Sequence, residues 1–76
     1  MSTVGDILQK QRMSKGLTIE DVASELKIPY DTIFKIENNL VNQNADIIFI
    51  FGHLRVYCNY LDLDTSEIIK NFKQQI

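Results

Sequence analysis

The sequence predicts an all-α fold, a five-helix bundle that contains a repressor-like helix-turn-helix. Apolar residues recur at helical spacing along most of the chain. One proline and three glycines punctuate this pattern, and no repeat or low-complexity stretch interrupts it. A length of 76 residues fits one domain over residues 1–76, with a small core that leaves no room for an enclosed active site.

The first two helices are predicted from their caps and their apolar spacing. The first is expected from about residue 3 to residue 15, where Ser2 or Thr3 can cap its start. Gly16 fits the left-handed position after its end. The second helix begins after Thr18, whose hydroxyl can cap the exposed amides of the first turn. Its core-facing residues are Ile19, Val22, Ala23 and Leu26.

Three more helices follow. Pro29 ends the second helix and suits the first turn of the third, which runs to about Glu37. After a short loop over residues 40–44, the fourth helix is expected from about residue 45 to residue 61 and is the most apolar part of the chain. Asp64 can cap the fifth helix. The inner face of that helix carries Ile68, Ile69 and Phe72.

The composition excludes several classes of protein. The single cysteine, Cys58, has no disulfide partner, and one histidine with one cysteine is too few for a zinc site. The absence of a disulfide framework suits a reducing compartment. No apolar run reaches the length of a membrane span, and the first residues do not have the pattern of a signal peptide. We expect no cofactor, no metal and no enzymatic activity, because no catalytic constellation is present.

The stretch over residues 17–37, LTIEDVASELKIPYDTIFKIE, resembles the helix-turn-helix of the Cro/repressor class. Ala23 occupies the small-residue position where the second and third helices approach. The apolar positions of the class are matched by Val22, Leu26, Ile28, Ile33 and Ile36. The resemblance implies an ion pair between Arg12 of the first helix and Glu37 of the third. The alternative is two independently solvated charges.

The third helix lacks the residues of a DNA reader. In the Cro/repressor class its first residues contact base edges in the major groove, and here they are Tyr30, Asp31, Phe34 and Lys35. Asp31 would face phosphates, and Phe34 offers no hydrogen bond. Residues 17–37 hold two basic and five acidic side chains, a net of −3, and the whole chain has a net charge of −2. A protein-binding module is therefore favoured, and a sequence-specific DNA-binding regulator is the alternative.

The predicted fourth helix is apolar on two faces. At about 100° per residue, the core face is formed by Ile47, Ile50, Leu54, Cys58 and Leu61, with Phe51 and Tyr57 at its edges. The second face is formed by Phe49, His53, Val56 and Tyr60. A helix with two apolar faces must be buried on both, so the second face is either covered by the other helices or offered to a partner. Its aromatic residues with polar groups favour the partner.

The fourth helix and the following turn read FIFGHLRVYCNYLDLDTSEII. With the helix-turn-helix before it, this pattern resembles the N-terminal cytoplasmic domain of the bacterial RodZ family. The matching residues here are Phe49, Gly52, Leu54, Arg55, Tyr57, Leu61, Leu63 and Asp64. Those in the first half are Gly5, Leu8, Arg12, Gly16, Leu17, Ala23, Ile28 and Glu37.

The resemblance implies a cell-shape protein whose cytoplasmic domain binds the actin-like protein MreB. A later transmembrane helix would hold the domain at the inner face of the cell membrane, so this chain would be the N-terminal fragment of a longer protein. The family contact uses aromatic residues of the fourth helix, which carry over to Phe49, His53 and Tyr57. Val56 and Tyr60 complete the expected partner surface. Structural roles are expected for Arg12, Ala23, Glu37, Gly52 and Leu54.

Three positions depart from the family pattern. His53 replaces an aromatic residue after the glycine, and Phe51 replaces a basic residue before it. A proline that usually precedes the fourth helix is absent. These departures bear on the footprint of filament binding and not on the fold.

Overall fold

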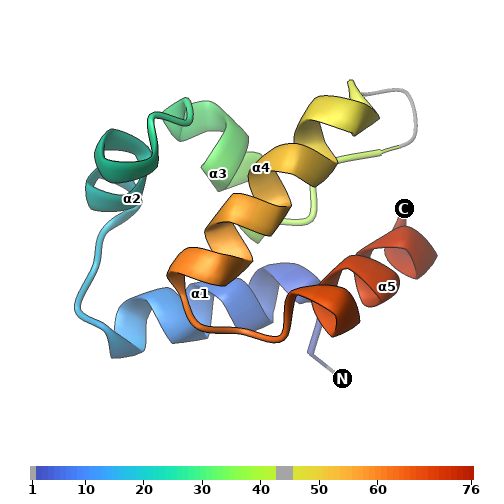
Figure 1. Cartoon of the computed structure of the whole chain (residues 1–76), viewed down its shortest axis with the longest axis horizontal. Coiled ribbons are helices and arrows are strands. Elements are labelled where there is room, and N and C mark those ends of the chain that lie inside the picture. The colour runs from blue at the N-terminus through green and yellow to red at the C-terminus, as the bar shows by residue number, and fades with distance from the viewer. Residues whose placement is uncertain (1, 43–45) are drawn as a thin grey trace.

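The computed structural model describes residues 2–42 and 46–76, and within them the secondary structure is five α-helices (Figure 1). The helices are α1 (Val4–Ser14), α2 (Ile19–Leu26), α3 (Tyr30–Glu37), α4 (Ile47–Tyr60) and α5 (Thr65–Gln75). The all-α prediction is confirmed, and the helix bounds lie within two residues of the predicted positions. The expected loop over residues 40–44 and the expected start of the fourth helix at residue 45 fall partly outside the described residues.

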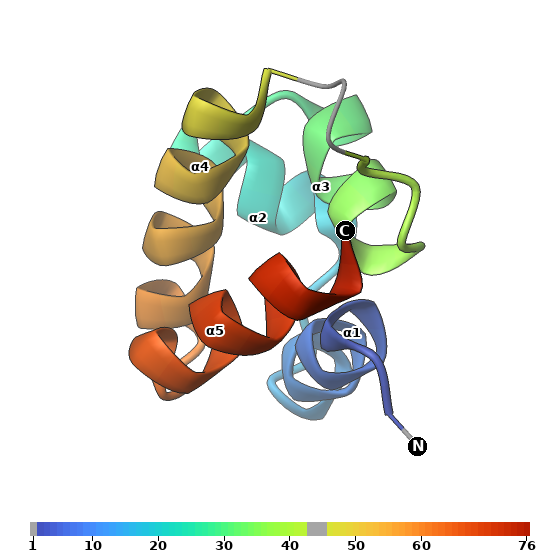
Figure 2. The same ribbon diagram turned by 90° about the vertical axis from the view of Figure 1, so that its right-hand side faces the viewer.

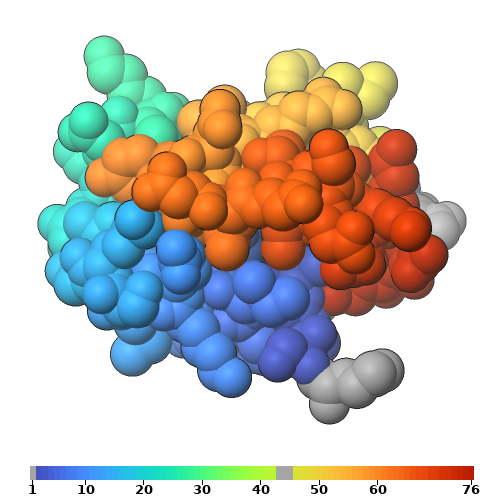
Figure 3. Space-filling view, turned by 60° about the horizontal axis from the view of Figure 1, so that its bottom comes forward, coloured from blue at the N-terminus to red at the C-terminus, as the bar shows by residue number. Residues whose placement is uncertain are grey.

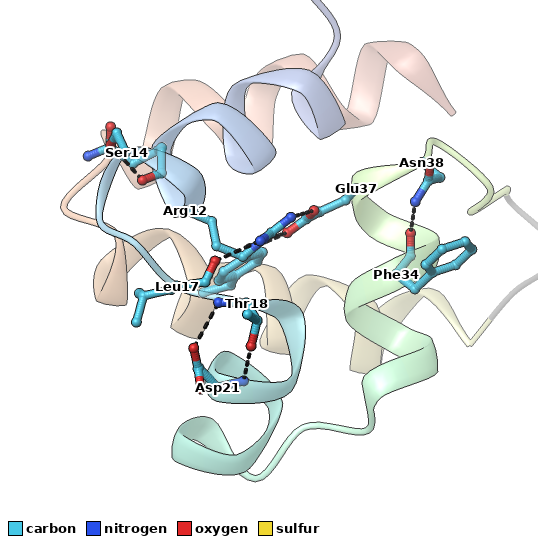
Figure 4. A network of polar contacts seen from close by, with 10 residues as sticks. Arg12, Ser14, Leu17, Thr18, Asp21, Phe34, Glu37 and Asn38 are labelled. Atoms are coloured by element: carbon cyan, nitrogen blue, oxygen red, sulfur yellow. Dashed lines mark hydrogen bonds and ion pairs between the residues drawn. The ribbon is translucent and has the colours of Figure 1, made fainter.

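Side-chain caps fix the starts of three helices. The Thr3 hydroxyl accepts a bond from the Asp6 amide, and the Asp6 carboxylate accepts one from the Thr3 amide, both at 3.2 Å. Thr18 and Asp21 exchange the same pair of bonds at 2.9 and 3.0 Å (Figure 4). The Asp64 carboxylate accepts a bond from an amide in the first turn of α5. These bonds satisfy amides that have no partner inside the helix.

Two residues with positive φ end the first two helices. Gly16 has a φ of 71°, as predicted for the residue after α1. Lys27 has a φ of 56° and ends α2 at a position where glycine is usual. The turn after Lys27 leads into α3, which packs on both α1 and α2 and completes the helix-turn-helix (Figure 1).

α5 closes the domain by packing on α4 and α1 (Figure 2). In the space-filling view, α1 in blue and α5 in orange to red lie side by side on one face (Figure 3). The core between the helices consists of Val4, Leu8, Val22, Ile28, Ile33, Ile36, Leu54, Tyr57, Cys58, Leu61, Ile68, Ile69 and Phe72. Ala23 packs against this core from α2. In the described part of the chain, every helix is too short or too polar to cross a membrane.

Candidate protein-interaction site

A buried polar network attaches α4 to the helix-turn-helix. Arg12 on α1 donates from Nε and Nη2 to the two carboxylate oxygens of Glu37 on α3, at 2.8 and 2.9 Å (Figure 4). Its Nη1 donates to the Leu17 carbonyl at 2.7 Å. The hydroxyl of Tyr57 on α4 donates to the same Glu37 carboxylate. The implied Arg12–Glu37 ion pair is therefore confirmed, and the alternative of two independently solvated charges is wrong.

Arg12 and Tyr57 both keep their protons at neutral pH. The hydrogen bond to Glu37 raises the pKa of Arg12 above its ordinary value, so the guanidinium stays charged. Burial, and then the hydrogen bond to Glu37, raise the pKa of Tyr57, so its hydroxyl remains a donor. In the described part of the chain, every buried side-chain nitrogen and oxygen has a hydrogen-bond partner. The network therefore has a structural role, because it connects α1, α3 and α4.

The prediction that Tyr57 belongs to a partner surface is wrong. Its side chain is 0% exposed and lies in the core. The ring can be buried because its hydroxyl finds an acceptor in Glu37, which removes the cost of an unpaired polar group. Tyr57 is a structural residue that orients α4, together with the fully buried Leu54.

The other four candidates form one stripe along α4, and Tyr60 in that stripe also packs against the core. Phe49 is 65% exposed and Val56 is 47% exposed. His53 and Tyr60 are half-buried in the same stripe. We call these four residues the outer face of α4. Ile48 is 82% exposed, and sequence reasoning missed it because its angular position falls between the two predicted apolar faces.

Gly52 lies beside the outer face, one turn from Ile48 and one turn from Val56. A Cβ atom at Gly52 would meet no atom within 4 Å. The packing of the domain therefore does not require glycine here, against the structural role expected of it. Gly5 differs, because a Cβ there would lie 2.1 Å from the Glu37 carbonyl oxygen.

The residues that a DNA reader would use lie exposed on α3. Tyr30 and Phe34 stack on each other with ring centroids 6.4 Å apart. Lys35, the basic residue of α3, forms an ion pair with Asp31 one turn earlier, at 3.0 Å. This surface is aromatic and locally neutral, and a phosphate would have to compete with Asp31 for Lys35. No group of three metal-ligating side chains occurs among the described residues.

Residues 7–68 match a family described as a helix-turn-helix domain. The chain is 32% identical over 63 residues to an uncharacterized protein of Haemophilus influenzae. The aligned stretch covers 82% of this chain and 21% of that protein. The chain thus spans about a fifth of the length of this curated relative. No solved structure matches the chain significantly. The match extends from α1 into α5 and includes the whole helix-turn-helix, so the chain belongs to this family of helix-turn-helix domains.

Proposed function

We propose that this domain is a non-catalytic adaptor of the bacterial cell-shape machinery that docks on the actin-like filament protein MreB through α4. The observation that carries the proposal is the outer face of α4, where Phe49 and Val56 are exposed in one stripe with the half-buried His53 and Tyr60. The pattern of α4 that resembles the RodZ family supports MreB as the partner, and the family's contact maps onto Phe49 and His53. The same resemblance supports a location at the cytoplasmic side of the cell membrane.

The outer face has the energetics of a binding surface. A large apolar side chain that moves from water into an interface contributes about 1.5–3 kcal/mol. The backbone of α4 is held by Leu54, Tyr57 and Cys58, all fully buried. The outer face is therefore already ordered before binding, which lowers the entropy cost of association.

The test is co-sedimentation of the domain with MreB filaments. The variant carries Phe49→Ala and His53→Ala, two substitutions one turn apart on the same face. Central aromatic anchors typically contribute about 2 kcal/mol or more each, so the pair should weaken binding by about a thousandfold.

The matched control is Phe34→Ala, which removes an exposed phenylalanine from α3 and should leave co-sedimentation unchanged. Circular dichroism verifies that each variant is folded. A folded double variant that still co-sediments would contradict the proposal, and so would a wild-type domain that does not bind filaments.

DNA binding is the second candidate function, since the chain belongs to a helix-turn-helix family. Tyr30, Asp31, Phe34 and Lys35 would then form the contact. The Asp31–Lys35 ion pair opposes this function, because it places a carboxylate where a phosphate would lie.

A further inference from the structure

A groove of about 500 Å³ lies between α4 and α5. α5 leaves the end of α4 at an angle and packs against it (Figures 1 and 2). Its walls include Arg55 from α4 and Lys70 and Lys73 from α5. Three basic residues thus line one groove of a chain whose net charge is −2, and no acidic residue lines it.

In the part of the chain that the structure describes, Arg55, Lys70 and Lys73 form no ion pair, whereas three other basic residues do. The Lys73 ammonium lies 5.6 Å from the centre of the Phe51 ring, a cation–π contact that holds its charge beside the groove. The nearby Asp64 carboxylate is used to cap α5 and lies outside the groove lining.

The donors in the groove fit a phosphate group better than a carboxylate. A guanidinium presents its N–H groups in a fork that matches phosphate oxygens, and the two ammonium groups add point charges. Thr65 and Ser66 also line the groove and carry hydroxyl donors. A carboxylate has two oxygens, which one guanidinium can satisfy. A phosphate monoester has three terminal oxygens and up to two charges, so it can use more of this donor set.

We propose that the α4–α5 groove binds a phosphate monoester, carried by a lipid head group such as that of phosphatidic acid or by a free phosphorylated ligand. The site does not depend on the function of the outer face. Arg55 lies about a third of a turn from Phe49 around the α4 axis, so a partner on Phe49 leaves the groove accessible. An adaptor could thus hold a protein and a phosphate group at the same time.

The test compares two variants with the same change in charge. Lys70→Gln with Lys73→Gln removes two cations from the groove. Lys10→Gln with Lys27→Gln removes two exposed cations of α1 and the α2 C-terminus that form no ion pair among the described residues and lie outside the groove. Thermal denaturation verifies that both variants are folded.

Two kinds of probe distinguish the sources of phosphate. The amide resonances of ¹⁵N-labelled domain are followed during titration with pyrophosphate and, for comparison, with a polyglutamate peptide. Binding to vesicles that contain phosphatidic acid, whose head group is a phosphate monoester, is compared with binding to vesicles of phosphatidylcholine. Shifts centred on Arg55, Ser66 and Lys70 with pyrophosphate indicate a free phosphorylated ligand. Binding to phosphatidic acid vesicles without a pyrophosphate response indicates a head group.

Each basic residue strengthens binding to an anionic surface by roughly fivefold. The groove variant should therefore bind its probe about 30-fold more weakly than wild type, while the control variant stays near wild type. Equal weakening of both variants would show unspecific attraction and overturn the proposal. Absence of a response to both probes, or tighter binding of polyglutamate than of pyrophosphate, would overturn it as well.

Discussion

At the scale of single residues, the carboxylate of Glu37 connects three helices. It accepts hydrogen bonds from Arg12 on α1 and from Tyr57 on α4, and it lies at the end of α3. The resemblance to the Cro/repressor class predicted the Arg12 contact. The Tyr57 contact could not be predicted, because helical periodicity gives the direction of a side chain and not the partner of its hydroxyl.

Removal of Arg12 should therefore destabilise the domain strongly. Arg12→Met leaves the Glu37 carboxylate buried without its charge partner, which typically costs about 3–5 kcal/mol of the free energy of unfolding. Lys15→Met is the matched control, because it breaks the exposed Lys15–Asp62 pair and should cost about 1 kcal/mol or less. Urea denaturation measures both. Similar losses in the two variants would contradict a structural role for the buried pair.

Cys58 and Tyr57 should make the free energy of unfolding decrease at alkaline pH. Burial raises the pKa of the Cys58 thiol from 9.0 to about 11. The folded domain then keeps a proton that the unfolded chain releases, so the thiol's contribution is full below pH 9 and is lost as pH rises toward 11. Its size is about 2–3 kcal/mol. The raised pKa of Tyr57 acts with the same sign from its ordinary value of 10.0 upward.

The free energy of unfolding should accordingly fall between pH 9 and pH 11. Cys58→Ala should show a smaller fall than wild type over this range, because only the tyrosine contribution remains. Urea denaturation at several pH values measures both proteins. Parallel curves for wild type and variant would show that the thiol does not titrate differently in the folded domain.

At the scale of elements, α4 shows which structural features helical periodicity predicts and which it does not. The spacing of apolar residues correctly assigned Leu54 and Cys58 to the core and Phe49 to a different face. It left open whether other helices cover that second face. Coverage depends on how α1 and α5 pack, and the structure leaves Phe49 and Val56 exposed. The helix itself was therefore predictable, while the extent of the outer face was not.

Two truncations on α4 should have different effects on stability. Leu54→Ala leaves a cavity in the core and should cost about 2–5 kcal/mol. Phe49→Ala removes a side chain that is 65% exposed, so its cost should stay near the range of surface substitutions, about 0.5 kcal/mol. Thermal denaturation of both variants decides the matter. Equal losses would mean that Phe49 is packed as core, and the outer face would lose its main anchor as a binding surface.

At the scale of the whole molecule, the helix-turn-helix acts as a support for α4. The end of α3 supplies the carboxylate that fixes α1 and α4, while the exposed side of α3 carries a neutral aromatic surface. The basic groove lies between α4 and α5, away from α3. The two candidate binding surfaces thus lie on α4 and α5, which the repressor-like half of the chain holds in place.

This distribution predicts weak binding to duplex DNA. Unspecific affinity depends on the number of phosphates that basic side chains neutralise, and typical dissociation constants are about 10⁻⁴ to 10⁻⁶ M at physiological salt. On α3 the basic residue is Lys35, which is paired with Asp31, and residues 17–37 carry a net charge of −3. Binding should therefore be weaker than this range. Fluorescence anisotropy with a labelled duplex at several salt concentrations measures it. Micromolar binding with a steep salt dependence would favour the DNA-binding regulator over the adaptor.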